Sequence, residues 1–195
     1  MLRMIIKNPL FDESRAAQAA AYLLFRAGGS LPVIKIMKLL YLAERLSLQR
    51  YGEPLTGDKL CAMPKGPVLS MTLELINGAN PPTSDGWDYW IAGRDNHMVA
   101  LADPSTIRSP DDLPCLSEAD IEVLCETWEK FGHFNQWKLV AYTHDKLPEW
   151  KDPDGSSLPI SYLDVFRATG FTEETAQRLA ARLETQSRVN AAFAA

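Results

Sequence analysis

Apolar residues recur at helical spacing along most of the chain, and the clearest case is the segment from about Val33 to Arg50. At 100° per residue, one broad apolar face holds Ile36, Leu39, Leu40, Ala43 and Leu46, and it is extended by Met37, Tyr41 and Leu48. This pattern predicts a largely buried helix. Gly52 ends it and Pro54, just beyond, prevents its continuing.

The same spacing predicts further helices before and after this one. They cover residues 12–27, 66–76, 117–131, 135–146, 161–168 and 172–190. Gly28-Gly29 stops the first, and Ser30 is expected to cap the following helix, with Pro32 in its first turn. Gly66-Pro67 is expected to open a helix, because proline suits the first helical turn. Ser117 and Asp120 have the spacing of a capping box.

A minor β component is also predicted. Leu60–Met63 is an extended piece, and residues 87–91 and 97–101 flank Gly93-Arg94-Asp95-Asn96 as a β-hairpin with a four- to five-residue connection. Segments rich in Gly, Pro, Asn and Ser predict loops at 77–86, 103–114 and 152–157. We therefore expect a mainly α fold, a compact helical domain with a small antiparallel hairpin, forming a single domain over residues 1–195.

Composition narrows the class of protein. The chain has 195 residues, 46% of them apolar, which is enough for a sizeable core. A net charge of −5 and a pI near 5.2 make nucleic acid an unlikely partner and suit a basic protein partner. Because no apolar run is long enough for a signal peptide or a membrane span, we expect a cytoplasmic protein without a membrane partner.

No pattern in the sequence indicates catalysis, a cofactor or a metal. The three cysteines and three histidines lack metal-ligand spacing, so the cysteines are read as small buried hydrophobes. Asp152-Pro153-Asp154-Gly155 resembles the start of a calcium loop, but Leu163 stands where a bidentate Glu is required. Phosphate-loop, dinucleotide and nucleophile-elbow motifs are absent from the sequence. We therefore predict no catalytic, cofactor-binding or metal-binding residues, and no enzymatic activity.

Several positions could instead contact a partner protein. The helix over 33–50 keeps a narrow polar strip of Lys35, Lys38, Arg45 and Gln49. Leu42 lies within this strip, where it either contacts a partner or is covered by a neighbouring loop or helix. Lys65 is a candidate because it lies beside a predicted helix start, which either attracts an anion or is only a tight entry permitted by Gly66. Trp87 and Trp90 are the last candidates, on the predicted hairpin, where aromatic side chains either face a partner or, more often, pack on the core.

Two polar residues are predicted to be buried. Glu44 projects among Leu40, Met37 and Leu48, so its carboxylate needs a donor, either the backbone or Lys65. The alternative is a role in recognition or acid–base chemistry. His144 is read as a structural hydrogen-bonding residue near a helix C-terminus rather than as an acid–base histidine.

Linked motifs in order carry a family resemblance. They are Lys35-x-x-Lys38-Leu39-Leu40-Tyr41-x-Ala43, Tyr51-Gly52-x-Pro54-Leu55, Ala62 with Gly66-Pro67-Val68, Leu116-Ser117-x-x-Asp120, Phe131-Gly132, Leu139-x-x-x-Thr143-His144 and Pro148-x-Trp150. Together they resemble the Panacea domain of the SocA-like antitoxin family over roughly residues 14 to 165. The hairpin region and the Ala-rich tail depart from the pattern, so residues 166–195 are expected to be a C-terminal helical extension.

The resemblance implies an antitoxin of a toxin–antitoxin pair, which neutralises a toxin from a neighbouring gene by direct protein–protein binding. The family's toxins are diverse, so the resemblance does not identify the partner. A related member is instead a proteolytic adaptor that delivers its toxin to a AAA+ protease. Similar proteins also occur in phages and prophages without a known toxin, which leaves an uncharacterised enzyme open. The family has no established catalytic residues to carry over.

Overall fold

The computed structural model describes residues 8–78 and 86–193. Its α-helices are α1 (Glu13–Arg26), α2 (Val33–Tyr51), α3 (Ser70–Ile76), α4 (Trp87–Trp90), α5 (Glu118–Phe131), α6 (Gln136–Lys146), α7 (Tyr162–Ala168) and α8 (Glu173–Phe193). Two short 3₁₀ turns, Pro104–Thr106 and Pro110–Asp112, lie in the connection before α5. The part of the predicted loop that covers residues 79–85 lies outside the described residues.

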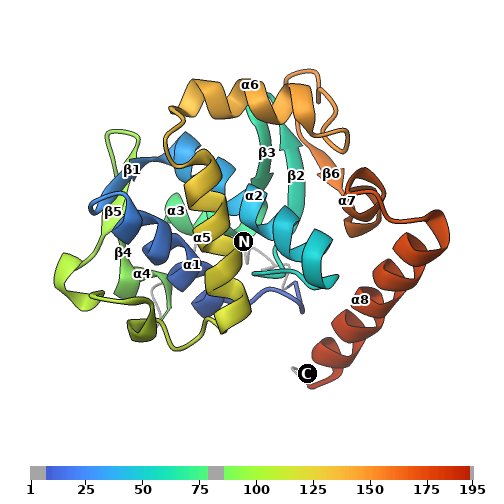
Figure 1. Ribbon diagram of the computed structural model, residues 1–195, viewed down its shortest axis with the longest axis horizontal. Coiled ribbons are helices and arrows are strands. Elements are labelled where there is room, and N and C mark those ends of the chain that lie inside the picture. Colours follow the sequence, from blue (N-terminus) through green and yellow to red (C-terminus); the bar gives the residue numbers. More distant parts are fainter. Residues whose placement is uncertain (1–7, 79–85, 194–195) are drawn as a thin grey trace, which may run out of the picture.

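Two small antiparallel sheets accompany the helices. The first has the order β1-β5-β4, formed by Ser30–Pro32, Met98–Leu101 and Ile91–Asp95. The second has the order β3-β2-β6, formed by Gly66–Leu69, Leu60–Met63 and Leu158–Ile160. Figure 1 shows the two sheets apart from each other, with the helices between and around them.

Helix α2 is the centre of the packing. It contacts α1, α5, α6, α7 and strand β3, and its residues from Ile36 to Glu44 are all buried. Helix α6 packs against β3, and Figure 1 shows it lying across the ends of β2 and β3. The burial of α2 follows from its broad apolar face, since a helix that is apolar around most of its circumference needs neighbours on most sides.

Several sequence predictions are confirmed. Helices dominate, with a minor antiparallel β component. The Ser117 hydroxyl accepts from the Asp120 amide while Asp120 accepts from the Ser117 amide, which is the predicted capping box. Helix α2 ends at Gly52, whose left-handed φ of 66° suits glycine. The extended piece at Leu60–Met63 is strand β2.

Two predicted helix starts are wrong. Ser30 does not cap α2, because Ser30–Pro32 is strand β1, and α2 begins after Pro32. Gly66-Pro67 does not open a helix either, because Gly66–Leu69 is strand β3, and α3 begins at Ser70. Pro67 is compatible with that strand since β3 is at the edge of its sheet, where the missing N–H breaks no ladder.

The predicted hairpin exists, but its first strand is displaced. Trp87–Trp90 forms the short helix α4, and the strand begins only at Ile91. The connection is shorter than expected, since Asp95 pairs with Met98 across Asn96 and His97, which both have positive φ. Trp87 and Trp90 are 3% and 7% exposed, so they pack in the core, and the expectation that they stand on a strand of the hairpin is wrong.

Helix α8 lies along one side of the molecule next to α7, with the C-terminus at its far end (Figure 1). Only Ala176 and Leu183 of this helix are buried, in agreement with the thin apolar stripe of the sequence. Arg182 ties it to Gly52 by donating to the backbone carbonyl at 2.8 Å. Within the described residues, no helix is long and apolar enough to cross a membrane.

Candidate functional site: a partner-binding groove

The polar residues of α2 make long-range contacts inside the molecule. The Lys35 ammonium donates to the Gly132 carbonyl at 2.7 Å, at the C-terminus of α5. The Glu149 carboxylate accepts from Arg45 at 2.7 Å and from the Tyr41 hydroxyl at 3.2 Å. Most of the predicted polar strip therefore fixes α2 to distant segments.

Lys38 illustrates this most clearly. Its side chain was expected on the polar strip, but the residue is 1% exposed and its ammonium donates to the Pro67 carbonyl at 2.7 Å. Burial lowers the pKa of this amine to about 7. Leu42 is also buried, in agreement with the alternative that a neighbouring element covers it, and it lies with Arg45 in a crevice of about 60 Å³ beside α5.

Glu44 has the backbone partners that its burial required. One carboxylate oxygen accepts from the Thr56 amide at 2.8 Å and the Thr56 hydroxyl at 2.9 Å, and the other accepts from the Gly57 amide at 3.2 Å. Burial raises the pKa of Glu44 to about 7, against the opposing effect of these hydrogen bonds. These contacts support the structural interpretation of Glu44, and Lys65 is not among them.

His144 lies in the last turn of α6 and is half-buried against Trp150. Its ring stacks on Trp150 with centroids 3.9 Å apart, and Trp150 Nε1 donates to the Met63 carbonyl at 3.1 Å. Burial, together with the nearby Lys38 charge, lowers the pKa of His144. Its buried Nε2 has no hydrogen-bond partner among the described atoms, so the predicted hydrogen-bonding role of His144 finds no support at this nitrogen.

A groove of about 650 Å³ includes Lys38 in its lining. It opens between the β2–β3 turn and the β4–β5 hairpin, with the start of α2 as its floor and the start of α6 as one wall. We call it the Trp137 groove; it is lined by Pro32, Val33, Ile34, Met37, Lys38, Met63, Pro64, Lys65, Gly66, Val68, Leu73, Arg94, His97, Gln136 and Trp137. Most of these residues are apolar, as in binding clefts generally.

Trp137 gives this groove an exposed aromatic wall. Its side chain is 57% exposed although tryptophan is usually covered in a monomer. The Lys65 ammonium lies 5.8 Å from the centroid of its ring, within cation–π range. On the opposite rim, the Arg94 guanidinium donates to the Asn77 side-chain oxygen at 2.8 Å and lies 2.6 Å from His97 Nδ1.

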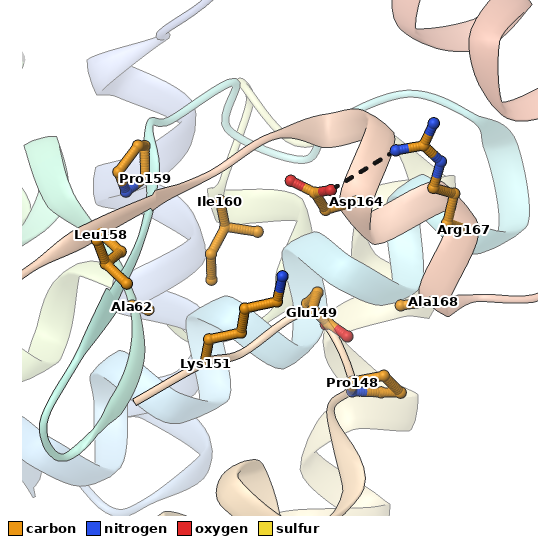
Figure 2. A pocket seen from close by; sticks show the side chains of 10 residues that line it. All are labelled: Ala62, Pro148, Glu149, Lys151, Leu158, Pro159, Ile160, Asp164, Arg167 and Ala168. Carbon is orange, nitrogen blue, oxygen red and sulfur yellow. Dashed lines mark ion pairs between the residues drawn. The ribbon is translucent and has the colours of Figure 1, made fainter. Parts of the chain in front are cut away.

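Two other hollows border strand β6. The first, of about 590 Å³, is drawn in Figure 2: Leu158, Pro159 and Ile160 form an apolar side, while Lys151 and the Asp164–Arg167 ion pair supply charges of both signs. The second, of about 640 Å³, lies between α8 and the β2–β6 region. Part of the lining of each of these two hollows comes from residues after position 151.

The structure brings together only some of the predicted partner-binding residues. Lys38 and Lys65 line the Trp137 groove, whereas Leu42 and Arg45 lie in the separate crevice, and Trp87 and Trp90 are in the core. The partner-binding role of all six stays a prediction.

Sequence reasoning missed Trp137 and Arg94. A signal for Trp137 was present, because at 100° per residue it lies on the face of α6 opposite the buried Leu139. Arg94 could not be found in this way, since its position depends on the register of the hairpin.

Among the described residues, no group of three or more His, Cys, Asp or Glu side chains is arranged to hold a metal ion. Comparison with curated proteins and with solved structures gave no match. Comparison with protein families matched residues 36–151 to one described as "Antitoxin SocA-like, Panacea domain". The matched segment runs from α2 through Trp150 and holds most of the Trp137 groove. More than half of the chain matches, and the chain therefore belongs to the SocA-like antitoxin family with a Panacea domain.

Proposed function

We propose that this protein is the antitoxin of a toxin–antitoxin pair and neutralises its toxin by direct protein–protein binding in the cytoplasm. The single observation that carries the proposal is the family match over residues 36–151. The expected partner is a protein toxin encoded by a neighbouring gene. On this proposal, binding rather than catalysis is the activity of the protein.

The structure supports binding through the matched domain. The Trp137 groove is concave and largely apolar, and it carries an exposed aromatic side chain on one wall and a hydrogen-bonded arginine on the opposite rim. Exposed aromatic and arginine side chains are the types that most often dominate protein–protein binding energy. The two hollows beside β6 use residues beyond 151 and are therefore weaker candidates for a function shared by the family.

Co-expression tests the proposal. The adjacent open reading frame is expressed from an inducible promoter, with and without this protein, and growth is followed while the two products are purified together. We expect growth arrest without the protein, recovery with it, and co-elution of both chains on gel filtration. A harmless neighbouring product, together with the absence of a complex, would contradict the proposal.

A proteolytic adaptor would rescue growth by a different route. In that case the toxin is delivered to a AAA+ protease, so its half-life falls when this protein is present. A pulse-chase in strains with and without the protease separates the two routes. Direct neutralisation predicts a toxin half-life that is unchanged or longer, and growth rescue in both strains.

A further inference from the structure

The charges of the Trp137 groove differ in sign from those of the whole chain. Its lining residues include Lys38, Lys65, Arg94 and His97 but no Asp or Glu. Yet the chain has 25 acidic and 20 basic residues, so a lining of average composition would carry carboxylates. A basic lining within an acidic protein indicates complementarity to a negatively charged group of the partner.

The two rim cations are free to pair with such a group. Among the described residues, neither Lys65 nor Arg94 forms an ion pair with a carboxylate, although seven such pairs occur elsewhere in that part of the chain. Arg94 is held in place by a hydrogen bond to the Asn77 side-chain oxygen and by a 2.6 Å contact with His97 Nδ1, and neither group is a carboxylate. A guanidinium fixed in this way loses little side-chain entropy when a carboxylate binds it.

The floor and walls of the groove between these cations are apolar, so they favour an apolar group of the partner. Met37 and Val68 are buried at the base, while Trp137 and Met63 present apolar surface to the opening. The volume of about 650 Å³ is that of a cleft that receives one or a few bulky side chains. Apolar groups that fill such a cleft release water from both surfaces.

We propose that the Trp137 groove receives a segment of the toxin in which a bulky apolar side chain is flanked by Asp or Glu. The apolar side chain packs against Trp137 and the α2 floor, and the flanking carboxylates meet Lys65 and Arg94. This inference rests on the proposed function and names the site and the partner chemistry that serve it. A basic toxin is compatible with it, since only this segment has to be acidic.

Binding of the purified toxin to full-length variants tests the inference. Lys65→Glu and Arg94→Glu reverse the rim charges, and Trp137→Ala removes the aromatic wall. Lys146→Glu, at the other end of α6, and Phe193→Ala, at the exposed end of α8, are the matched controls. Circular dichroism and the thermal midpoint establish that each variant is folded.

We expect each groove variant to weaken binding by roughly tenfold or more, and the controls to bind like wild type. The two charge reversals should slow association most at low salt. With benzoylphenylalanine at position 137, photocrosslinking should capture a toxin peptide that carries an apolar residue next to Asp or Glu.

The inference is overturned if wild type binds the toxin and the groove variants bind equally well, in which case the proposed function stands. It is also overturned if the controls lose as much affinity as the groove variants, or if the crosslinked peptide is basic. Failure of wild type itself to bind the toxin overturns the proposed function, and the inference with it.

Discussion

The replacement of Glu44 by Gln tests how helix α2 is stabilised. In the native protein both carboxylate oxygens accept hydrogen bonds, two from Thr56 and one from the Gly57 amide. Glutamine keeps the shape but has only one oxygen, so its NH₂ group faces a backbone donor. The residue is completely buried, so water cannot compensate. One unsatisfied buried donor costs about 1–3 kcal/mol of unfolding free energy.

The pH dependence gives a sharper expectation. The pKa of Glu44 is raised from 4.5 to about 7 in the folded protein, so between these values the native state binds more protons than the unfolded state. The preferential protonation of Glu44 in the folded state therefore adds its full contribution to the unfolding free energy below pH 4.5, and this contribution is lost as the pH rises through 7. A shift of this size corresponds to about 3 kcal/mol. Glutamine does not titrate, so the variant lacks this dependence.

Urea denaturation of both proteins at pH 5 and pH 8 measures the effect. At pH 5 the folded protein holds Glu44 as the neutral acid, whose hydroxyl oxygen can still accept from the Gly57 amide, whereas the glutamine NH₂ group cannot. We therefore expect the variant to be less stable at pH 5 by about 1–3 kcal/mol. We expect the difference to shrink, or to change sign, at pH 8. Other titrating groups are common to both proteins and cancel in the difference. A difference in unfolding free energy that is the same at both pH values would refute the assignment of a raised pKa to Glu44.

Three further substitutions probe the same interior by chemical denaturation. Lys38→Met removes the amine whose pKa is lowered by burial to about 7. Because the unfolded state keeps this proton up to a higher pH, the unfolding free energy of wild type should rise by about 2 kcal/mol relative to that of the variant between pH 7 and 9. Unfolding free energies that change in parallel with pH in the two proteins would contradict this. Gly66→Ala adds a Cβ 2.5 Å from the Thr143 hydroxyl at a backbone φ of +92°. We expect a loss of about 2 kcal/mol or more of unfolding free energy. An unchanged urea midpoint would argue against this close contact between Gly66 and Thr143. Arg45→Met leaves the buried Glu149 carboxylate without its cation, so we expect a loss of about 3–5 kcal/mol of unfolding free energy. Partial recovery of this stability in the double variant with Glu149→Gln would show that the unpaired charge is the cause.

The sequence allowed the longer helices to be predicted because their signals are local, whereas the short helix α4 was expected as a strand. Apolar periodicity located α2, and the cap residues Asp12, Ser117 and Asn135 marked the starts of α1, α5 and α6. The polar contacts of α2 could not be predicted in the same way. Lys38 pairs with a carbonyl 29 residues away and Arg45 with a carboxylate 104 residues away.

The β elements were harder to predict because their pairing is non-local. Gly66-Pro67 has the local signature of a helix start, yet pairing with β2 holds it in a strand. Strand β6 was missed because its three residues are defined only by pairing with β2, nearly 100 residues earlier. The Trp137 groove combines residues from 32 to 137, so the sequence could indicate only its separate parts: Lys38 and Lys65 were predicted, and Trp137 had a signal in its position on α6.

Hydrogen exchange of the free protein and of its complex with the toxin tests the central claim most directly. If the groove within the Panacea domain binds the toxin, complex formation should slow exchange in the β2–β3 turn, the β4–β5 hairpin and the start of α6 together. These segments are far apart in sequence, and all of them line the groove. Unchanged exchange there, with protection confined to α8 or to the hollows beside β6, would contradict the account.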